Sequence, residues 1–214
     1  MTELHTIEAR IHGRYLVRAP QMPPPWPLLV GFHGYGENAS DHLEALGMIP
    51  GSQSWLIVSV QALHPFYTRQ DRVVANWMTR EDRELAIADN VDYVGRVLDR
   101  IREEHQTRPI LVFAGFSQGG AMAYRAAASY PADGLIILAA DVPPDVLATR
   151  RVPLPPVLIG RGMKDDWYTE AKQAADVAAL SRNGTSVEAC VFDGGHEWTD
   201  DFRTAASGVL QRLA

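Results

Sequence analysis

Six short apolar runs narrow the fold of this sequence more than any other feature. Residues 28–32, Leu-Leu-Val-Gly-Phe, show the pattern, because the run is continuous and does not alternate with polar residues. Strands of this kind are buried on both faces of a sheet. In a strand with one solvent-exposed face, apolar and polar residues alternate. We therefore predict six buried strands, at residues 28–32, 55–60, 110–114, 135–138, 157–159 and 187–192.

Helical patterns lie between most of these runs. The clearest covers residues 81–104, where apolar residues from Ile87 to Ile101 recur at alternating steps of four and three. Thr79 and Asp82 resemble a capping box at its start. Further helices are predicted at residues 119–130, 170–180 and 199–213. Strands that alternate with helices predict an α/β fold, with a mostly parallel sheet and helices on both faces.

The residues before the first of these strands predict an N-terminal β-hairpin. Residues 6–18 contain β-compatible side chains on either side of a break at His12 and Gly13. A proline cluster follows at residues 20–27, but too few residues precede it for a separate domain. We therefore expect one domain that covers residues 1–214.

Composition and charge exclude several classes of function. The net charge of −6 is spread along the chain without a basic stripe, which argues against a nucleic-acid partner. No apolar run approaches the roughly 20 residues that span a bilayer, and residues 1–5 have no signal-peptide pattern, so we expect no stable membrane association. The single cysteine, Cys190, excludes an internal disulfide and fits a cytoplasmic location. The residues show no metal-ligand spacing and we expect no cofactor, while a homodimer is compatible with the sequence.

One five-residue motif carries the chemistry. Gly115-Phe116-Ser117-Gln118-Gly119 matches G-x-S-x-G, directly after the predicted strand 110–114 and before a helix of small residues. This is the setting of a nucleophile elbow, in which a serine sits on a strained turn at a helix N-terminus. The helix dipole and its free N–H groups favour negative charge that develops there. Ser117 is therefore the predicted nucleophile.

The partners of such a serine follow it in the order acid, then histidine. His196, which lies after the last predicted strand, is the only histidine downstream of Ser117 and is the predicted base. Two carboxylates, Asp165 and Asp166, follow the predicted strand 157–159. Either could orient the imidazole and stabilise its charged form.

Two backbone N–H groups are needed to hold an oxyanion. The residue after the nucleophile, Gln118, supplies one. The second is predicted to come from Tyr35, because Gly34 and Gly36 allow the backbone to turn at that point. His33 is expected to order this loop by hydrogen bonding rather than to act as a base.

Two long connections are candidates for the walls of a substrate pocket, because ligands bind beyond the carboxyl ends of parallel strands. They cover residues 61–80 and 139–156. In the first, Phe66 and Trp77 either contact substrate or anchor the loop to the core. Trp167, beside the candidate acids, is the third predicted substrate contact.

With these motifs in place, the chain resembles the phospholipase/carboxylesterase family of α/β-hydrolases, which includes the acyl-protein thioesterases. The four motifs occur in the family's order, at residues 33–36, 115–120, 162–165 and 194–197. The resemblance implies an α/β-hydrolase fold without a large cap domain, Asp165 as the acid, and a tryptophan near the site at Trp77. The family's apolar-Val-Pro stretch after the acid is replaced here by Asp166-Trp167-Tyr168, so no preference for long acyl chains is implied.

Together these features predict an enzyme that cleaves carboxylic esters of short to medium acyl chain through an acyl-enzyme. The substrate is expected to be a small-molecule ester or thioester. An acyl thioesterase with the same triad is the alternative. A ligand-binding relative without turnover is a third interpretation, against which the presence of serine, acid and histidine together argues.

Overall fold

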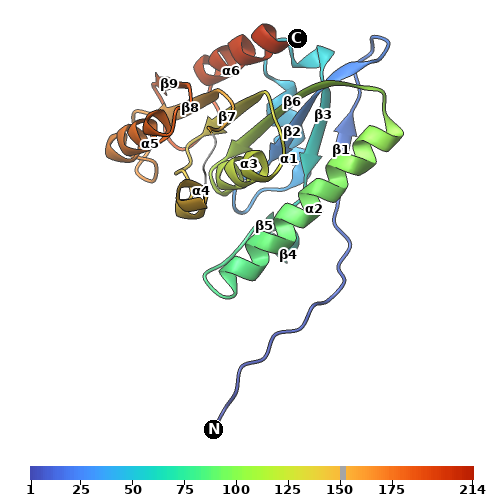
Figure 1. The fold of residues 1–214 in the computed structure, drawn as a ribbon, viewed down its shortest axis with the longest axis vertical. Coiled ribbons are helices and arrows are strands. Elements are labelled where there is room, and N and C mark those ends of the chain that lie inside the picture. Colours follow the sequence, from blue (N-terminus) through green and yellow to red (C-terminus); the bar gives the residue numbers. More distant parts are fainter. Residues whose placement is uncertain (150–152) are drawn as a thin grey trace.

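A seven-stranded sheet forms the centre of the molecule within residues 1–149 and 153–214, which the computed structural model describes (Figure 1). Its strand order is β1-β3-β2-β6-β7-β8-β9, and every neighbouring pair is parallel except β1 with β3. The strands of this sheet are β1 (Tyr15–Arg18), β2 (Trp26–Phe32), β3 (Leu56–Val60), β6 (Thr107–Phe116), β7 (Gly134–Leu138), β8 (Val157–Gly162) and β9 (Val187–Phe192). A separate hairpin consists of β4 (His64–Tyr67) and β5 (Val73–Asn76).

Helices cover both faces of this sheet. They are α1 (Ala39–Gly47), the 3-10 turn η1 (Ser52–Ser54), α2 (Arg83–Glu104), α3 (Gln118–Ser129), α4 (Pro144–Thr149), α5 (Glu170–Arg182) and α6 (Asp200–Leu213). On one face, Gly31 of β2 lies against Leu46 of α1, and Gly160 of β8 lies against Phe202 of α6. On the other face, Gly115 of β6 packs against α3, which α2 covers in turn (Figure 1). The expected α/β-hydrolase fold is confirmed, and the described residues form no large cap domain.

The six predicted apolar runs all form strands of the central sheet. They correspond to β2, β3, β6, β7, β8 and β9, and most of their side chains are buried on both faces. The exception is β9 at the edge of the sheet, where Glu188 and Val191 are exposed. Burial on both faces explains why these strands show a continuous apolar run instead of an alternating pattern.

The N-terminal segment differs from the predicted hairpin in its first half. Residues 1–14 contain no regular secondary structure, and the N-terminal end of the chain lies away from the sheet (Figure 1). The second half forms β1, whose antiparallel partner is β3, with Tyr15 opposite Val60. The antiparallel N-terminal strand is thus present, but a strand from the sheet interior replaces the expected local partner. Pairing with β3 also buries part of β1, which a free hairpin could not achieve.

The start of α2 also differs from its prediction. The helix begins at Arg83, and Asp82 adopts a left-handed conformation with φ of 45° and caps no helix N–H with its side chain. Thr79 instead accepts a hydrogen bond from the N–H of Glu81, which closes a turn before the helix. The predicted capping box is therefore wrong. None of the described helices is both long enough and apolar enough to cross a membrane.

Candidate active site

Ser117 occupies a strained turn between β6 and α3. Its backbone angles are φ 53° and ψ −122°, a region that residues other than glycine rarely adopt. The turn is held by the N–H of Ser117, which donates to the carbonyl of Leu138 at 2.9 Å. A Cβ at Gly119 would lie 2.0 Å from the carbonyl oxygen of Phe32, and one at Gly115 would lie 2.3 Å from that of Gly119. This crowding is the physical reason for the two glycines of the motif.

The loops after β8 and β9 bring an acid and a histidine together. The N–H of Met163 donates to the carbonyl of Phe192, and the N–H of Lys164 donates to that of Gly194, both at 2.8 Å. These bonds continue the parallel pairing of the two strands past their carboxyl ends. Asp165 and His196, which follow directly, are therefore placed side by side.

Asp165 is the carboxylate that contacts His196. Its Oδ2 lies 2.8 Å from Nδ1 of His196, and its Oδ1 accepts the N–H groups of Trp167 and Tyr168, both at 2.8 Å. The Asp165 side chain is fully buried. A carboxylate can only accept, so Nδ1 carries the proton and Nε2 presents a lone pair. Asp166 is exposed, and the structure shows no hydrogen bond from its side chain to the described residues.

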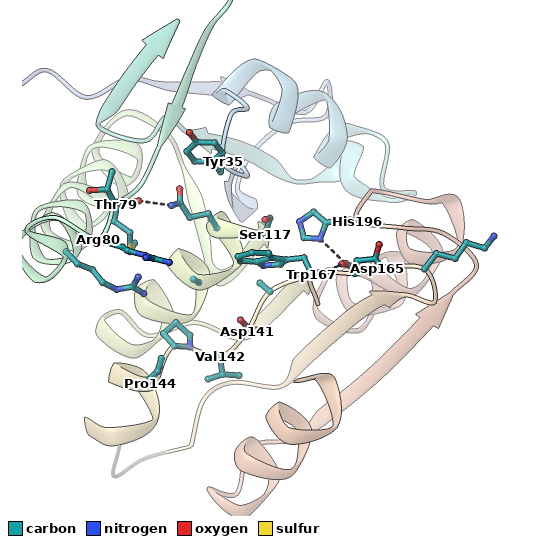
Figure 2. A pocket seen from close by; sticks show the side chains of 18 residues that line it. Tyr35, Thr79, Arg80, Ser117, Asp141, Val142, Pro144, Asp165, Trp167 and His196 are labelled. Atoms are coloured by element: carbon teal, nitrogen blue, oxygen red, sulfur yellow. Dashed lines mark hydrogen bonds and ion pairs between the residues drawn. The ribbon is translucent and has the colours of Figure 1, made fainter. Parts of the chain in front are cut away.

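Ser117, Asp165 and His196 line one cavity of about 980 Å³. In Figure 2 the imidazole of His196 lies between Ser117 and the Asp165 carboxylate. Within the described part of the chain, Ser117 makes no side-chain hydrogen bond to His196, whereas the bond from His196 to Asp165 is formed. Nucleophile–base hydrogen bonds are often long without substrate and tighten when the substrate binds.

The two residues predicted to supply the oxyanion donors, Tyr35 and Gln118, line the same cavity. Gln118 is the first residue of α3, so its N–H has no partner within the helix. Across the chain as described, neither this N–H nor that of Tyr35 has an intramolecular acceptor. Both donors are thus free to bind an oxygen of a ligand.

Side chains next to Tyr35 hold its loop in place. His33 is buried; its Nε2 accepts the N–H of Ala62 at 3.0 Å, and its Nδ1 lies 2.7 Å from the carbonyl of Gly34. This pair of bonds requires the neutral imidazole, and burial lowers the pKa of His33 accordingly. Glu37 accepts the N–H of Gly34 at 2.7 Å, and burial raises its pKa. His33 therefore orders the loop, as expected.

Two of the three predicted substrate contacts lie elsewhere. Trp77 is fully buried, does not line the cavity, and donates its indole N–H to the carbonyl of His33 at 2.8 Å. Phe66 is half-buried outside the cavity, with its ring 5.5 Å from that of Tyr35. Neither residue lines the cavity, and both contact the loop that carries Tyr35, so substrate contact by Trp77 or Phe66 stays a prediction. Trp167 does line the cavity, with the ammonium of Lys172 4.9 Å from its ring centroid.

The two long connections contribute to the cavity as expected. Residues 78–80 of the first and residues 140–144 of the second line it, and residues 150–152 of the second lie outside the described residues. Two further lining residues, Arg80 and Arg83, were not singled out from the sequence. Arg80 precedes α2 and Arg83 is its first residue, so their place at the cavity could be predicted only if the start of this helix were known.

The side chain of Gln118 has a role that the motif did not predict. Its Oε1 accepts the N–H of Trp77, and its Nε2 donates to the carbonyl of Met78, both at 2.8 Å. Trp77 in turn bonds His33 at the start of the loop that carries Tyr35. Hydrogen bonds through Trp77 therefore link the residue beside the nucleophile to the start of the loop that carries Tyr35.

We expect Gln118→Ala to lower kcat by roughly 10- to 100-fold, because loss of one oxyanion donor costs about 10²–10³-fold and misplacement costs part of that. Substrate KM should change less, since the donors act on the transition state. Steady-state kinetics with an activated ester measure both constants. Gln173→Ala, at a buried glutamine that bonds Arg161 away from the cavity, is the matched control. A fall in thermal stability with unchanged kcat would leave Gln118 a purely structural role.

Comparison with known proteins identifies the family. Residues 28–213 match the model of the Alpha/beta hydrolase family. The chain belongs to the α/β-hydrolase family. A search of curated proteins found no match to the sequence of this α/β-hydrolase. The resemblance drawn from the four motifs is therefore confirmed at the level of the α/β-hydrolase family and its fold.

Solved structures share the fold of this α/β-hydrolase over nearly its whole length. Esterase PE8 superposes with a TM-score of 0.76 at 22% identity, covering 95% of this chain and 100% of that one. The Bacillus cereus carboxylesterase gives 0.75 at 18% identity, with 94% and 95% coverage. Acyl-protein thioesterase 2 of Zea mays gives 0.70 at 18% identity, with 94% and 99% coverage. At these identities the likeness establishes a common architecture.

Proposed function

We propose that this α/β-hydrolase is a serine esterase that cleaves carboxylic esters through an acyl-enzyme. The observation that carries the proposal is the hydrogen bond from His196 to the buried Asp165, beside a strained Ser117 in one cavity. A nucleophile, a base and a group that orients the base are the parts that acyl transfer requires. The esterases among proteins of the same fold support the same chemistry.

Each residue has a defined step in the proposed reaction. Nε2 of His196 removes the proton of Ser117, whose Oγ attacks the ester carbonyl and forms a tetrahedral intermediate. The N–H groups of Tyr35 and Gln118 bind its oxyanion, and Asp165 stabilises the imidazolium. His196 then protonates the leaving alcohol. A water molecule, deprotonated by the same imidazole, attacks the acyl-enzyme and releases the acid.

We infer short to medium acyl chains from the lining of the cavity. Its apolar lining, which includes Met78 and Val142, is interrupted by charged side chains at Arg80, Asp141 and Asp166. A long alkyl chain would have to lie against these charges and displace their water. Small esters can place their acyl group on the apolar lining alone.

An acyl thioesterase is the second candidate function. The same triad and oxyanion donors would act on a thioester, and a thiolate is a better leaving group than an alkoxide. The shared fold of acyl-protein thioesterase 2 favours this candidate. We place the protein in the cytoplasm in either case, on the strength of its single cysteine.

The purified protein should hydrolyse p-nitrophenyl esters and form a covalent adduct with a fluorophosphonate probe at Ser117. A series from two to twelve acyl carbons, with acyl-coenzyme A thioesters of the same chains, tests both chain length and leaving group. We expect kcat/KM to be highest for short and medium esters. Higher kcat/KM on thioesters throughout would favour the thioesterase, and a folded protein that neither reacts with the probe nor turns over any substrate would refute both.

A further inference from the structure

The cavity has a cationic end that the proposed chemistry does not use. Arg80, in the turn before α2, and Arg83, the first residue of that helix, both line the cavity. Figure 2 shows Arg80 on the far side of Ser117 from the Asp165 carboxylate. Both arginines are exposed, so their charged groups are hydrated and accessible to a ligand that enters the cavity.

The acidic neighbours of these arginines face a different part of the surface. Glu81, Asp82 and Asp89 line a separate groove together with His64, and none of the three borders the active-site cavity. Glu84, in the first turn of α2, lines neither the groove nor the cavity. No carboxylate of residues 81–89 therefore borders the cavity beside the two arginines.

Neither arginine has an ion-pair partner among the residues that the structure describes. The third cation of the cavity wall, Lys164, is paired with Asp193 at 2.6 Å. Two 2.8 Å bonds from Arg125 lower the pKa of Asp145, and the charge of Arg83 makes a smaller contribution in the same direction without an ion pair. The guanidinium groups of Arg80 and Arg83 thus keep donors available for a ligand.

The carboxylates of the cavity lie on its other walls. Asp141 follows β7 and is paired with Lys172 at 3.3 Å, and Asp166 stands beside Trp167. These charges repel an anion from their part of the cavity. An anion that enters is therefore directed to the arginine end, away from the residues that react.

We propose that Arg80 and Arg83 bind a carboxylate carried by the ester substrate at a position remote from the scissile carbonyl. This inference rests on the proposed esterase function and specifies its substrate class. A guanidinium matches a carboxylate through two parallel hydrogen bonds, and charge-assisted bonds of this kind are about twice as strong as neutral ones.

Paired esters test which part of the substrate carries the charge. For the acyl part, p-nitrophenyl hydrogen adipate is compared with p-nitrophenyl hexanoate, which lacks the terminal carboxylate. For the alcohol part, 4-(2-carboxyethyl)phenyl butyrate is compared with 4-propylphenyl butyrate, whose leaving group has similar acidity. We expect the wild-type protein to prefer the anionic member by kcat/KM in at least one pair, and added salt to reduce that preference.

The double variant Arg80→Gln with Arg83→Gln should lower this anionic-to-neutral ratio by roughly 10-fold or more, as expected for lost hydrogen bonds to a charged group. Arg96→Gln, on the same helix and paired with Asp92 outside the cavity, should leave the ratio unchanged. If the anionic-to-neutral ratio of kcat/KM falls only in the acyl pair, the carboxylate belongs to the acyl part of the substrate. If it falls only in the alcohol pair, the carboxylate belongs to the alcohol part.

An unchanged ratio in both pairs, with the neutral esters still hydrolysed, would overturn the inference and leave the esterase function standing. Failure of all four esters together with no fluorophosphonate adduct would refute the esterase function and this inference with it. The neutral esters therefore separate the two failures.

Discussion

Replacing Ser117 by alanine is expected to lower kcat for ester hydrolysis by roughly 10⁴–10⁶-fold while the fold remains intact. The alanine variant has no nucleophile, so only the oxyanion donors and substrate binding remain to accelerate direct attack by water. His196→Ala should cause a loss of the same order, since the two residues act as a unit. Initial rates with p-nitrophenyl butyrate, together with circular dichroism of each variant, measure the effect.

The exposed serine at the other end of α3 provides a control. Ser129→Ala changes the same side chain on the same helix outside the cavity and should retain wild-type kcat. The left-handed backbone at Ser117 adds a second expectation, because alanine fits that conformation no better than serine does. Stability should therefore change little. If Ser117→Ala or His196→Ala kept a tenth of the wild-type rate, the triad assignment would be wrong.

Asp165→Asn is expected to reduce kcat by on the order of 10⁴-fold. The asparagine oxygen can still accept the N–H groups of Trp167 and Tyr168, which turns its NH₂ group toward Nδ1 of His196. Nδ1 must then accept, so the imidazole proton moves to Nε2 and the lone pair that deprotonates Ser117 is lost. Steady-state kinetics on the folded variant measure this loss. Because asparagine has nearly the same volume as aspartate, the substitution opens no cavity in the core.

Asp166→Asn is the matched test at the adjacent carboxylate. Its side chain is exposed and has no hydrogen bond within the described chain, so we expect kcat to change by no more than about 3-fold. A severe loss in this variant, with a mild one in Asp165→Asn, would transfer the role of the acid to Asp166. Both variants remove one negative charge at adjacent positions. A difference between their kcat values therefore reflects the contact with His196 and not the change in net charge.

The sequence predicted the elements of this fold well because burial on both faces leaves a continuous apolar run, as in residues 28–32. It also predicted the order of Ser117, Asp165 and His196, which the carboxyl ends of parallel strands bring to one edge of the sheet. The residues alone left Asp165 and Asp166 open, and only the resemblance to the family favoured Asp165. Both follow the same strand, and only the turn after it determines which carboxylate faces the imidazole.

The side-chain roles of Trp77 and Gln118 could not be predicted from the sequence, for one physical reason. Trp77 was expected at the cavity as readily as in the core, and its burial depends on a partner for its indole N–H, the carbonyl of His33. Gln118 was named for its backbone alone, and its side chain bonds a segment about forty residues earlier in the chain. Such long-range polar pairings leave no periodic pattern, whereas strands and helices do.

The strand β9 at the edge of the sheet has a consequence for how this protein loses activity. His196 depends on a few backbone bonds between the ends of β8 and β9, and β9 has a neighbour on one side only. Segments of this kind open locally at a lower free energy than the core strands do. Partial detachment of β9 would separate the imidazole from Asp165 while β2, β6 and β7 stay paired. Catalytic activity thus depends on the pairing of an edge strand. It can be lost while the rest of the protein remains folded.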